Sequence, residues 1–300
     1  MSVWICRRFP AGVLKEAEVR EFDVEADDGR ILHAYDVGAT GRDDELVLLW
    51  HHGTPNIGAP PEPLFGAAAV LGLRWIGYDR PGYGGSAPRP GATVASAAND
   101  AARVADHLGI DRFAVFGHSG GGPRAMACGA LLGDRILSVV SVSAPAPWPA
   151  EGLDFFAGMS DGSVREMGAA AKGGRSALEH ILATEDFDPE SFTTADWSAL
   201  SGEWSWFDGI VTAGTAHGWG GMIDDDLAAM SPWGFDVSQL NKPTLFMHGA
   251  DDRMIPSSHA RWLAARCPRA ELRLEAGQGH ISVLGSAPGA LEWVRARAVS

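Results

Sequence analysis

The sequence has few cysteines, few basic residues and no long apolar run, and each shortage excludes a class of protein. No stretch approaches the roughly 20 apolar residues of a membrane span, and Val3 to Cys6 is too short an apolar stretch for a secretory signal. The three cysteines, Cys6, Cys128 and Cys267, show neither paired spacing nor a C-x-x-C, which argues against a disulfide framework or a zinc site. We therefore expect a cytoplasmic protein with reduced thiols and no membrane partner.

Basic residues are outnumbered, because 38 Asp and Glu face 24 Lys and Arg for a formal charge of −14. Most of the excess lies between Ala150 and Leu240, where 16 acids face three bases. A chain without a basic patch lacks the electrostatic footprint of nucleic-acid binding, so we expect no nucleic-acid partner. We interpret the acidic segment mainly as a solvated outer face, with Asp224 to Asp226 at a loop or helix start. No pattern indicates an oligomeric state.

Short apolar runs alternate with Ala-rich stretches along most of the chain, which predicts an α/β fold with a mainly parallel sheet. Asp28-Gly29 between the first two runs is a hairpin signal. The predicted strands are residues 19–25, 30–37, 46–50, 73–78, 113–116, 136–142, 244–247 and 271–274. The predicted helices are residues 64–71, 93–108, 123–132, 257–266 and 287–298.

The alternation lapses in the middle of the chain, where Gly, Trp and acids dominate and no apolar strand can be recognised. We predict an α/β core formed by residues 1–145 and 234–300, with an insertion at residues 146–233. A length of 300 residues suits one large domain with such an insertion.

The most specific local string is Gly117-His118-Ser119-Gly120-Gly121, between a predicted strand and a predicted helix. In that context G-x-S-x-G predicts a nucleophile elbow, a strained turn that exposes the serine hydroxyl. The alternatives are a plain glycine-rich turn or a dinucleotide phosphate cradle. The cradle requires G-x-G-x-x-G and an acid about 20 residues further on, and neither is present.

A serine nucleophile needs a base, and the base needs an orienting acid. His280 stands in Gly277-Gln278-Gly279-His280, a loop after the last predicted strand, where it can reach a serine at a strand end. Two acids compete in the loop after the strand 244–247, and we favour Asp252 over Asp251 because it lies four residues before Pro256.

An oxyanion hole requires backbone N–H groups directed at the developing negative charge. His52-Gly53-Thr54-Pro55 follows the strand 46–50 and offers the N–H of Thr54, and Gly120 directly after Ser119 offers a second. Adjacent residues at a strand end point in opposite directions, so His51 and His52 do not predict a metal pair. We interpret His52 as support for the turn, and we expect no metal and no cofactor.

These motifs, together with Asp79-Arg80-Pro81-Gly82-Tyr83-Gly84-Gly85-Ser86, resemble the α/β-hydrolase fold superfamily in order and spacing from about Phe22 to Val294. The resemblance implies Ser119 as nucleophile, Asp252 as orienting acid and His280 as base. It further implies Thr54 and Gly120 as oxyanion donors, and a mainly helical cap formed by the insertion. It argues against the haloalkane dehalogenase and epoxide hydrolase branches, which have an aspartate in place of Ser119.

The insertion is rich in tryptophan, which suggests an apolar pocket or a small core of its own. Candidate pocket residues are His52, Gly53, Trp204 and Trp206. We expect a serine esterase acting on a small or medium apolar ester. The alternative is an aminopeptidase or amidase, because Glu203 to Asp208 loosely resembles cap segments of proline iminopeptidases. An acyltransferase, a carbon-carbon bond hydrolase and a non-catalytic ligand receptor also remain open.

Overall fold

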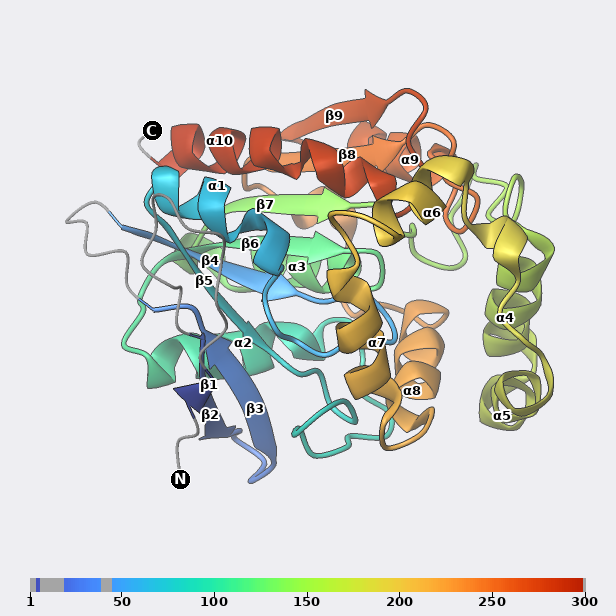
Figure 1. The fold of residues 1–300 in the computed structure, drawn as a ribbon, viewed down its shortest axis with the longest axis horizontal. Coiled ribbons are helices and arrows are strands. Elements are labelled where there is room, and N and C mark those ends of the chain that lie inside the picture. Colours follow the sequence, from blue (N-terminus) through green and yellow to red (C-terminus); the bar gives the residue numbers. More distant parts are fainter. Residues whose placement is uncertain (1–3, 6–18, 39–44, 299–300) are drawn as a thin grey trace.

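A computed structural model describes residues 4–5, 19–38 and 45–298 (Figure 1). Its described residues form a nine-stranded sheet in the order β1-β2-β3-β5-β4-β6-β7-β8-β9. The first four strands in this order pair antiparallel, and those from β5 to β9 run parallel. The strands are β1 (Trp4–Ile5), β2 (Val19–Glu25), β3 (Ile31–Asp36), β4 (Leu46–His51), β5 (Leu73–Tyr78), β6 (Phe113–His118), β7 (Ile136–Val142), β8 (Thr244–Gly249) and β9 (Ala270–Glu275). This is the mostly parallel α/β sheet that the sequence predicts.

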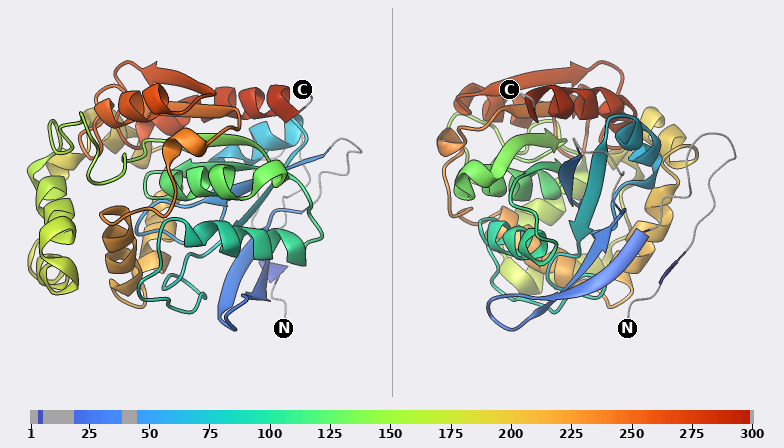
Figure 2. Two further views of the ribbon diagram at one scale, coloured as in Figure 1. Left: turned by 180° about the vertical axis from the view of Figure 1, so that it is seen from behind. Right: turned by 90° about the vertical axis from the view of Figure 1, so that its left-hand side faces the viewer.

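Helices cover both faces of the sheet (Figure 2). They are α1 (Phe65–Val70), α2 (Ser96–His107), α3 (Gly121–Leu131), α9 (Ser258–Arg266) and α10 (Ala287–Ala298). Alternate residues of β4 point to opposite faces, so Val47 and Leu49 pack with α2, α3 and α9. Leu48 and Trp50 pack on the other face with α1 and α10. Strands buried on both faces explain the continuous apolar runs of the sequence.

Five further helices lie between β7 and β8, beyond the carboxyl ends of β6 and β7 (Figure 1). They are α4 (Asp161–Lys172), α5 (Gly174–Thr184), α6 (Thr194–Leu200), α7 (Trp206–Thr215) and α8 (Gly220–Ala229). Short 3₁₀ helices are η1 (Glu62–Leu64), η2 (Gly133–Arg135), η3 (Pro189–Ser191), η4 (Val237–Gln239) and η5 (Ser282–Ser286). Within the described ranges, no helix is long and apolar enough to cross a membrane.

The acidic segment differs from expectation at three residues. Asp196, Asp225 and Asp226 are buried, and the run that includes Asp224 lies within α8 rather than in a loop or at a helix start. The interpretation as a solvated face is therefore wrong for these three side chains. Buried carboxylates need partners. Asp196 and Asp225 find theirs in the segments that carry the predicted site residues.

The cysteines that the structure describes are free and buried. Cys128 lies in α3 and Cys267 directly after α9. Burial raises the pKa of the Cys128 thiol, which keeps this sulfur protonated and unreactive. Cys6 and the apolar stretch that ends with it lie outside the described residues, apart from positions 4 and 5.

Candidate active site

Ser119 occupies a sharp turn between β6 and α3. Its φ of 53° lies in the left-handed region, which is costly for a residue with a side chain. The Ser119 N–H donates to Val142 O at the end of β7 over 2.8 Å, and the Ser119 carbonyl accepts the Gly122 N–H at 2.9 Å. This is the strand-turn-helix geometry that a nucleophile elbow requires.

The glycines around Ser119 allow a close approach of three elements. A Cβ on Gly117 would lie 2.3 Å from Gly121 O, and a Cβ on Gly121 would lie 2.0 Å from His51 O. No side chain fits at these distances, so β4, β6 and α3 can meet only where glycine stands. Ser119 is left partly exposed at the end of the sheet.

His280 and Asp252 form a buried hydrogen-bonded pair. His280 Nδ1 lies 2.8 Å from Asp252 Oδ2, and Asp252 Oδ1 accepts the N–H groups of Met254 and Ile255 at 3.0 and 2.9 Å. Asp251 is exposed. The loop after β8 therefore directs Asp252, and not Asp251, at the histidine.

Burial and charge oppose each other at this pair. Burial lowers the pKa of His280, but the charge and hydrogen bond of Asp252 together with the charge of Asp196 outweigh it, so the pKa of His280 lies above its usual value. Burial raises the pKa of Asp252, but the opposing effect of His280 and His248 is larger. The pKa of Asp252 therefore lies well below its usual range. The pair is therefore built to hold an ionised carboxylate beside a histidine that can accept a proton.

His118, within the serine string, contacts the histidine loop directly. Its Nε2 lies 3.0 Å from His280 O, and the two rings are 5.1 Å apart. Burial and His280 lower the pKa of His118 to about 3, so its ring is neutral. The end of β6 thus carries Ser119 and also supports the loop that carries His280.

Thr54 and Gly120 lie side by side. A Cβ on Gly120 would lie 3.6 Å from Thr54 N, and a Cβ on Gly53 would lie 3.5 Å from Ser119 Cβ. The Gly53 carbonyl is held by His52 Nδ1 at 2.7 Å and by Arg80 Nη2 at 3.2 Å. Because a trans peptide is planar, fixing the Gly53 carbonyl directs the Thr54 N–H to the opposite side.

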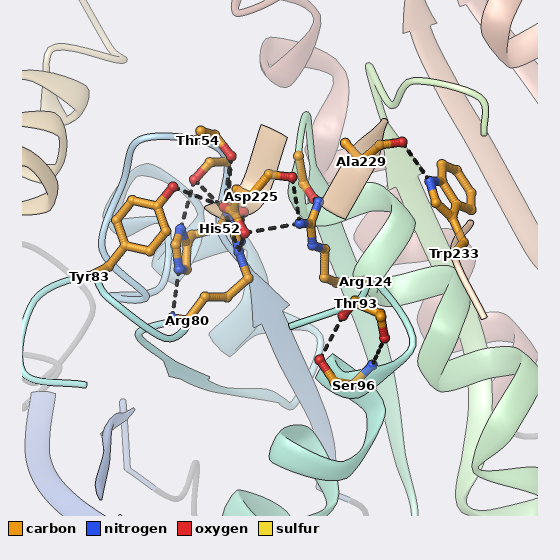
Figure 3. Close-up of polar contacts among 12 residues, drawn as sticks. His52, Thr54, Arg80, Tyr83, Thr93, Ser96, Arg124, Asp225, Ala229 and Trp233 are labelled. Carbon is orange, nitrogen blue, oxygen red and sulfur yellow. Dashed lines mark hydrogen bonds and ion pairs between the residues drawn. The ribbon is translucent and has the colours of Figure 1, made fainter. Parts of the chain in front are cut away.

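A buried ionic cluster centred on Asp225 includes the Thr54 hydroxyl (Figure 3). Asp225 of α8 accepts from the guanidinium groups of Arg80 and Arg124, at 3.0 Å from Arg80 Nε and 2.9 Å from Arg124 Nη2. It also accepts the hydroxyls of Thr54 at 3.0 Å and Tyr83 at 2.9 Å. Although burial opposes it, the two arginines hold the pKa of Asp225 far below its usual value.

The cluster joins both segments that carry the candidate oxyanion donors. Arg80 donates to the carbonyls of His52 and Gly53, and Arg124 Nη1 donates to Gly120 O at 2.8 Å. Neither Arg124 nor Asp225 is predicted as a site residue from the sequence. Arg124 lies one helical turn after the serine string, in a helix that the sequence predicts to be buried. A charged residue there indicates a buried ion pair, but nothing in the sequence identifies Asp225 as its partner.

The four candidate pocket residues occupy different environments. His52 is fully buried, and its Nε2 accepts the Arg80 N–H at 3.0 Å, so its ring supports the turn. Gly53 faces Ser119. Trp204 is buried in the core formed with α1 and α10, whereas Trp206 is half-buried.

Other tryptophans of the insertion do not form one cluster. Trp233 is buried in the core with α2 and α3, and Trp197 and Trp219 are 43% and 42% exposed. Phe207 of α7 contacts the His118 ring at 5.9 Å between centroids. The insertion therefore also contacts the serine string through a phenylalanine, which is not among the residues predicted from the sequence.

His51 and His52 diverge as expected for neighbours at a strand end. His51 Nε2 lies 3.3 Å from Cys128 Sγ, whereas the His52 ring bonds Gly53 and Arg80. In the parts of the chain that the structure describes, no three or more His, Cys, Asp or Glu side chains form a group that could hold a metal ion.

The chain belongs to the α/β hydrolase fold family, whose sequence pattern matches residues 47–287. Together with the sheet topology, this match confirms the predicted fold, and it makes the protein an α/β-hydrolase enzyme. Its substrate is accordingly a small molecule.

Several proteins resemble this chain along nearly its whole length. It is 29% identical over 271 residues to a non-heme haloperoxidase of Rhodococcus erythropolis, covering 86% of this chain and 92% of that protein. It is 25% identical over 286 residues to a 2-hydroxy-6-oxononadienedioate/2-hydroxy-6-oxononatrienedioate hydrolase of Cupriavidus pinatubonensis, covering 90% of each. A thermophilic esterase of Thermogutta terrifontis has the same fold, with a TM-score of 0.65, 20% identity, and coverage of 93% of this chain and 99% of that one.

Proposed function

We propose that the protein is a serine hydrolase that cleaves a small or medium, apolar carboxylic ester through an acyl-enzyme. The observation that carries the proposal is the 2.8 Å contact between His280 Nδ1 and Asp252 Oδ2, at the same end of the sheet as Ser119 in its left-handed turn. An acid that orients a base, together with a base that can take the proton of a strained serine, is the arrangement that activates a hydroxyl.

In the proposed reaction, His280 Nε2 takes the proton of Ser119 Oγ as the oxygen attacks the ester carbonyl carbon. The Thr54 and Gly120 N–H groups stabilise the resulting oxyanion, typically by about 10²- to 10³-fold in rate for each donor. The histidine then protonates the leaving alkoxide, and water attacks the acyl-enzyme by the same route in reverse. Asp252 stays ionised and stabilises the imidazolium.

The helical insertion is proposed to act as a cap. Helix α7 approaches the Thr54 loop so closely that a Cβ on Gly214 would lie 1.9 Å from Pro55 O, and Phe207 of the same helix contacts His118. We place the apolar acyl group between Gly53 and the partly buried Trp206, with His52 and Trp204 behind them as support. Glu203 and Asp208, the acids that suggested an aminopeptidase, are exposed.

The test is a set of p-nitrophenyl esters of increasing acyl length, assayed with wild-type protein and with Ser119→Ala. We expect turnover and labelling by a fluorophosphonate probe in the wild type, and loss of both in a folded Ser119→Ala protein. Full turnover by Ser119→Ala would disprove the serine mechanism.

A carbon-carbon bond hydrolase is the second candidate, because the Cupriavidus pinatubonensis relative matches 90% of this chain. Adding a vinylogous 1,5-diketone to the panel distinguishes the two. Cleavage of the diketone with weak ester turnover would favour the second candidate, whereas fast ester turnover with an inert diketone would favour the first.

A further inference from the structure

Asp196, in the first turn of α6, is a buried carboxylate with an unusually large set of donors. Its Oδ2 accepts the Thr193 N–H and hydroxyl, each at 2.9 Å, which completes a capping box for α6. A capping box alone needs no further partner. Yet the side chain is fully buried, and its remaining hydrogen bonds leave the insertion altogether.

These hydrogen bonds come from the loop that carries His280. The His280 N–H donates to Asp196 Oδ2 at 3.2 Å, and the N–H groups of Ile281 and Ser282 donate to Oδ1 at 2.8 Å each. Three consecutive N–H groups, at the start of η5, are thus satisfied by one side chain 84 to 86 residues away. Left unpaired, each buried N–H would destabilise the loop.

Gly279 is the residue that admits this carboxylate. A Cβ at Gly279 would lie 2.0 Å from Asp196 Oδ2 and 2.7 Å from Thr193 Oγ1. The backbone at Gly279 does not have a positive φ, so glycine is required here for space and not for conformation. The Gly-His pair in the sequence therefore marks a contact with the insertion.

The charge of Asp196 also acts on the histidine. Burial raises the pKa of Asp196, but the hydrogen bonds from the N–H groups of Ser282, Thr193 and Ile281 lower it by more. The pKa of Asp196 is therefore below its usual value, and the carboxylate is ionised at neutral pH. The titratable and charged groups that face His280 are Asp252, His118 and Asp196. Of these, His118 is neutral and Asp252 is the direct partner, which leaves Asp196 as a second negative charge from a different element.

We infer that Asp196 is a positioning residue for the catalytic base: it fixes the backbone of residues 279–282 so that the His280 ring lies between Asp252 and Ser119. The inference rests on the proposed serine mechanism. Helix α6 therefore also aligns the catalytic base, because His280 is held in position only while α6 packs against the loop of residues 279–282. A displacement of about 1 Å in a catalytic group can cost about 10²-fold in rate.

The test uses Asp196→Asn and, as a second route to the same disturbance, Gly279→Ala. We expect a fall in kcat of about 10²-fold with little change in KM, a matching fall in the rate of fluorophosphonate labelling, and an acid limb of kcat/KM moved to lower pH. Asp208→Asn, the same change at an exposed acid in α7, is the control and should leave all three unchanged.

A double-mutant cycle separates alignment from general damage. Once Asp196→Ala has removed the carboxylate, Gly279→Ala should cost less than it does in the wild type, because the 2.0 Å contact with Asp196 Oδ2 is gone and only the contact with Thr193 Oγ1 remains. Additive losses from the two changes would show that they do not act through each other. Where Asp196→Asn does not fold, Gly279→Ala alone decides the result.

An NMR titration of the His280 ring gives a readout that needs no turnover. We expect a lower His280 pKa in Asp196→Asn and Gly279→Ala than in the wild type. An unlabelled, inactive wild type would refute the proposed function while the titration still tests Asp196. Unchanged titration in both variants, or an active wild type with unchanged labelling in both, would overturn the inference.

Discussion

Asp252 and His280, 28 residues apart in the chain, meet at 2.8 Å with neither side chain appreciably exposed. The neighbouring Asp251 is exposed. We predict that Asp252→Asn lowers kcat by about 10³- to 10⁴-fold, because the amide cannot stabilise the imidazolium and favours the wrong histidine tautomer. Ester turnover under saturating substrate measures the effect.

Asp251→Asn is the matched comparison, since it removes the same charge one residue away. We expect less than a twofold change in kcat, because an exposed acid is screened by solvent. If Asp251→Asn abolished turnover and Asp252→Asn did not, the roles assigned to the two acids would have to be exchanged.

The pH dependence of kcat/KM follows from the raised pKa of His280. The base must be neutral to accept the serine proton, so activity should be present above this pKa and lost as the pH falls through it. Because the Asp252 carboxylate raises the pKa of His280 against the effect of burial, the acid limb should lie above the usual histidine value of about 6.5.

The residual activity of Asp252→Asn offers an internal check on the acid limb. Without the Asp252 carboxylate, burial is opposed only by the charge of Asp196, so the pKa of His280 should fall and the limb should move to lower pH. If the acid limb of kcat/KM is at the same pH in Asp252→Asn as in the wild type, the limb reports the titration of a group other than His280.

The residues predicted from the sequence and those that were missed differ in a physical way. The turn at Ser119 needs a positive φ and close backbone contacts, and these constraints leave glycines beside the functional residue that can be recognised locally. Asp252 and His280 were likewise found in short loops after predicted strands. Trp204 is less clearly marked, because a large apolar indole gives the same sequence signal whether it supports a pocket or packs in the core, where Trp204 is buried.

The partners of Asp196 and Asp225 leave no such local mark. Thr54 and Asp225 are 171 residues apart, and His280 and Asp196 are 84 apart. Each acid stands in a segment where acids are common, so composition suggests solvated charge. Only the three-dimensional fold brings these carboxylates to the backbone of the site.

A third prediction concerns the buried cluster. Asp225→Asn leaves the guanidinium groups of Arg80 and Arg124 buried without their counter-charge. Breaking such a pair typically costs about 3–5 kcal/mol in the free energy of unfolding, and we expect a loss in this range from urea unfolding. Asp186→Asn, at an exposed site in the insertion, should change stability by less than about 0.5 kcal/mol.

The same substitution should also affect turnover. Arg80 holds the Gly53 carbonyl, and Arg124 holds that of Gly120, so loosening either guanidinium should misdirect the oxyanion donors. We expect kcat to fall by at least tenfold under conditions in which Asp225→Asn is fully folded. A destabilised variant with wild-type kcat would restrict the cluster to a role in stability.

The last prediction concerns the charge of the substrate. Between Ala150 and Leu240, 16 acids face three bases, and the buried Asp225 is neutralised by arginines of the core. The other acids still outnumber the bases of this segment, so its field should favour a cationic ester over a matched anionic one. Because the Debye length shrinks from about 30 Å at 0.01 M salt to about 3 Å at 1 M, the ratio of the two kcat/KM values should exceed one at low salt and approach one at high salt. Equal values at low salt would show that the exposed acids are directed away from the substrate entrance.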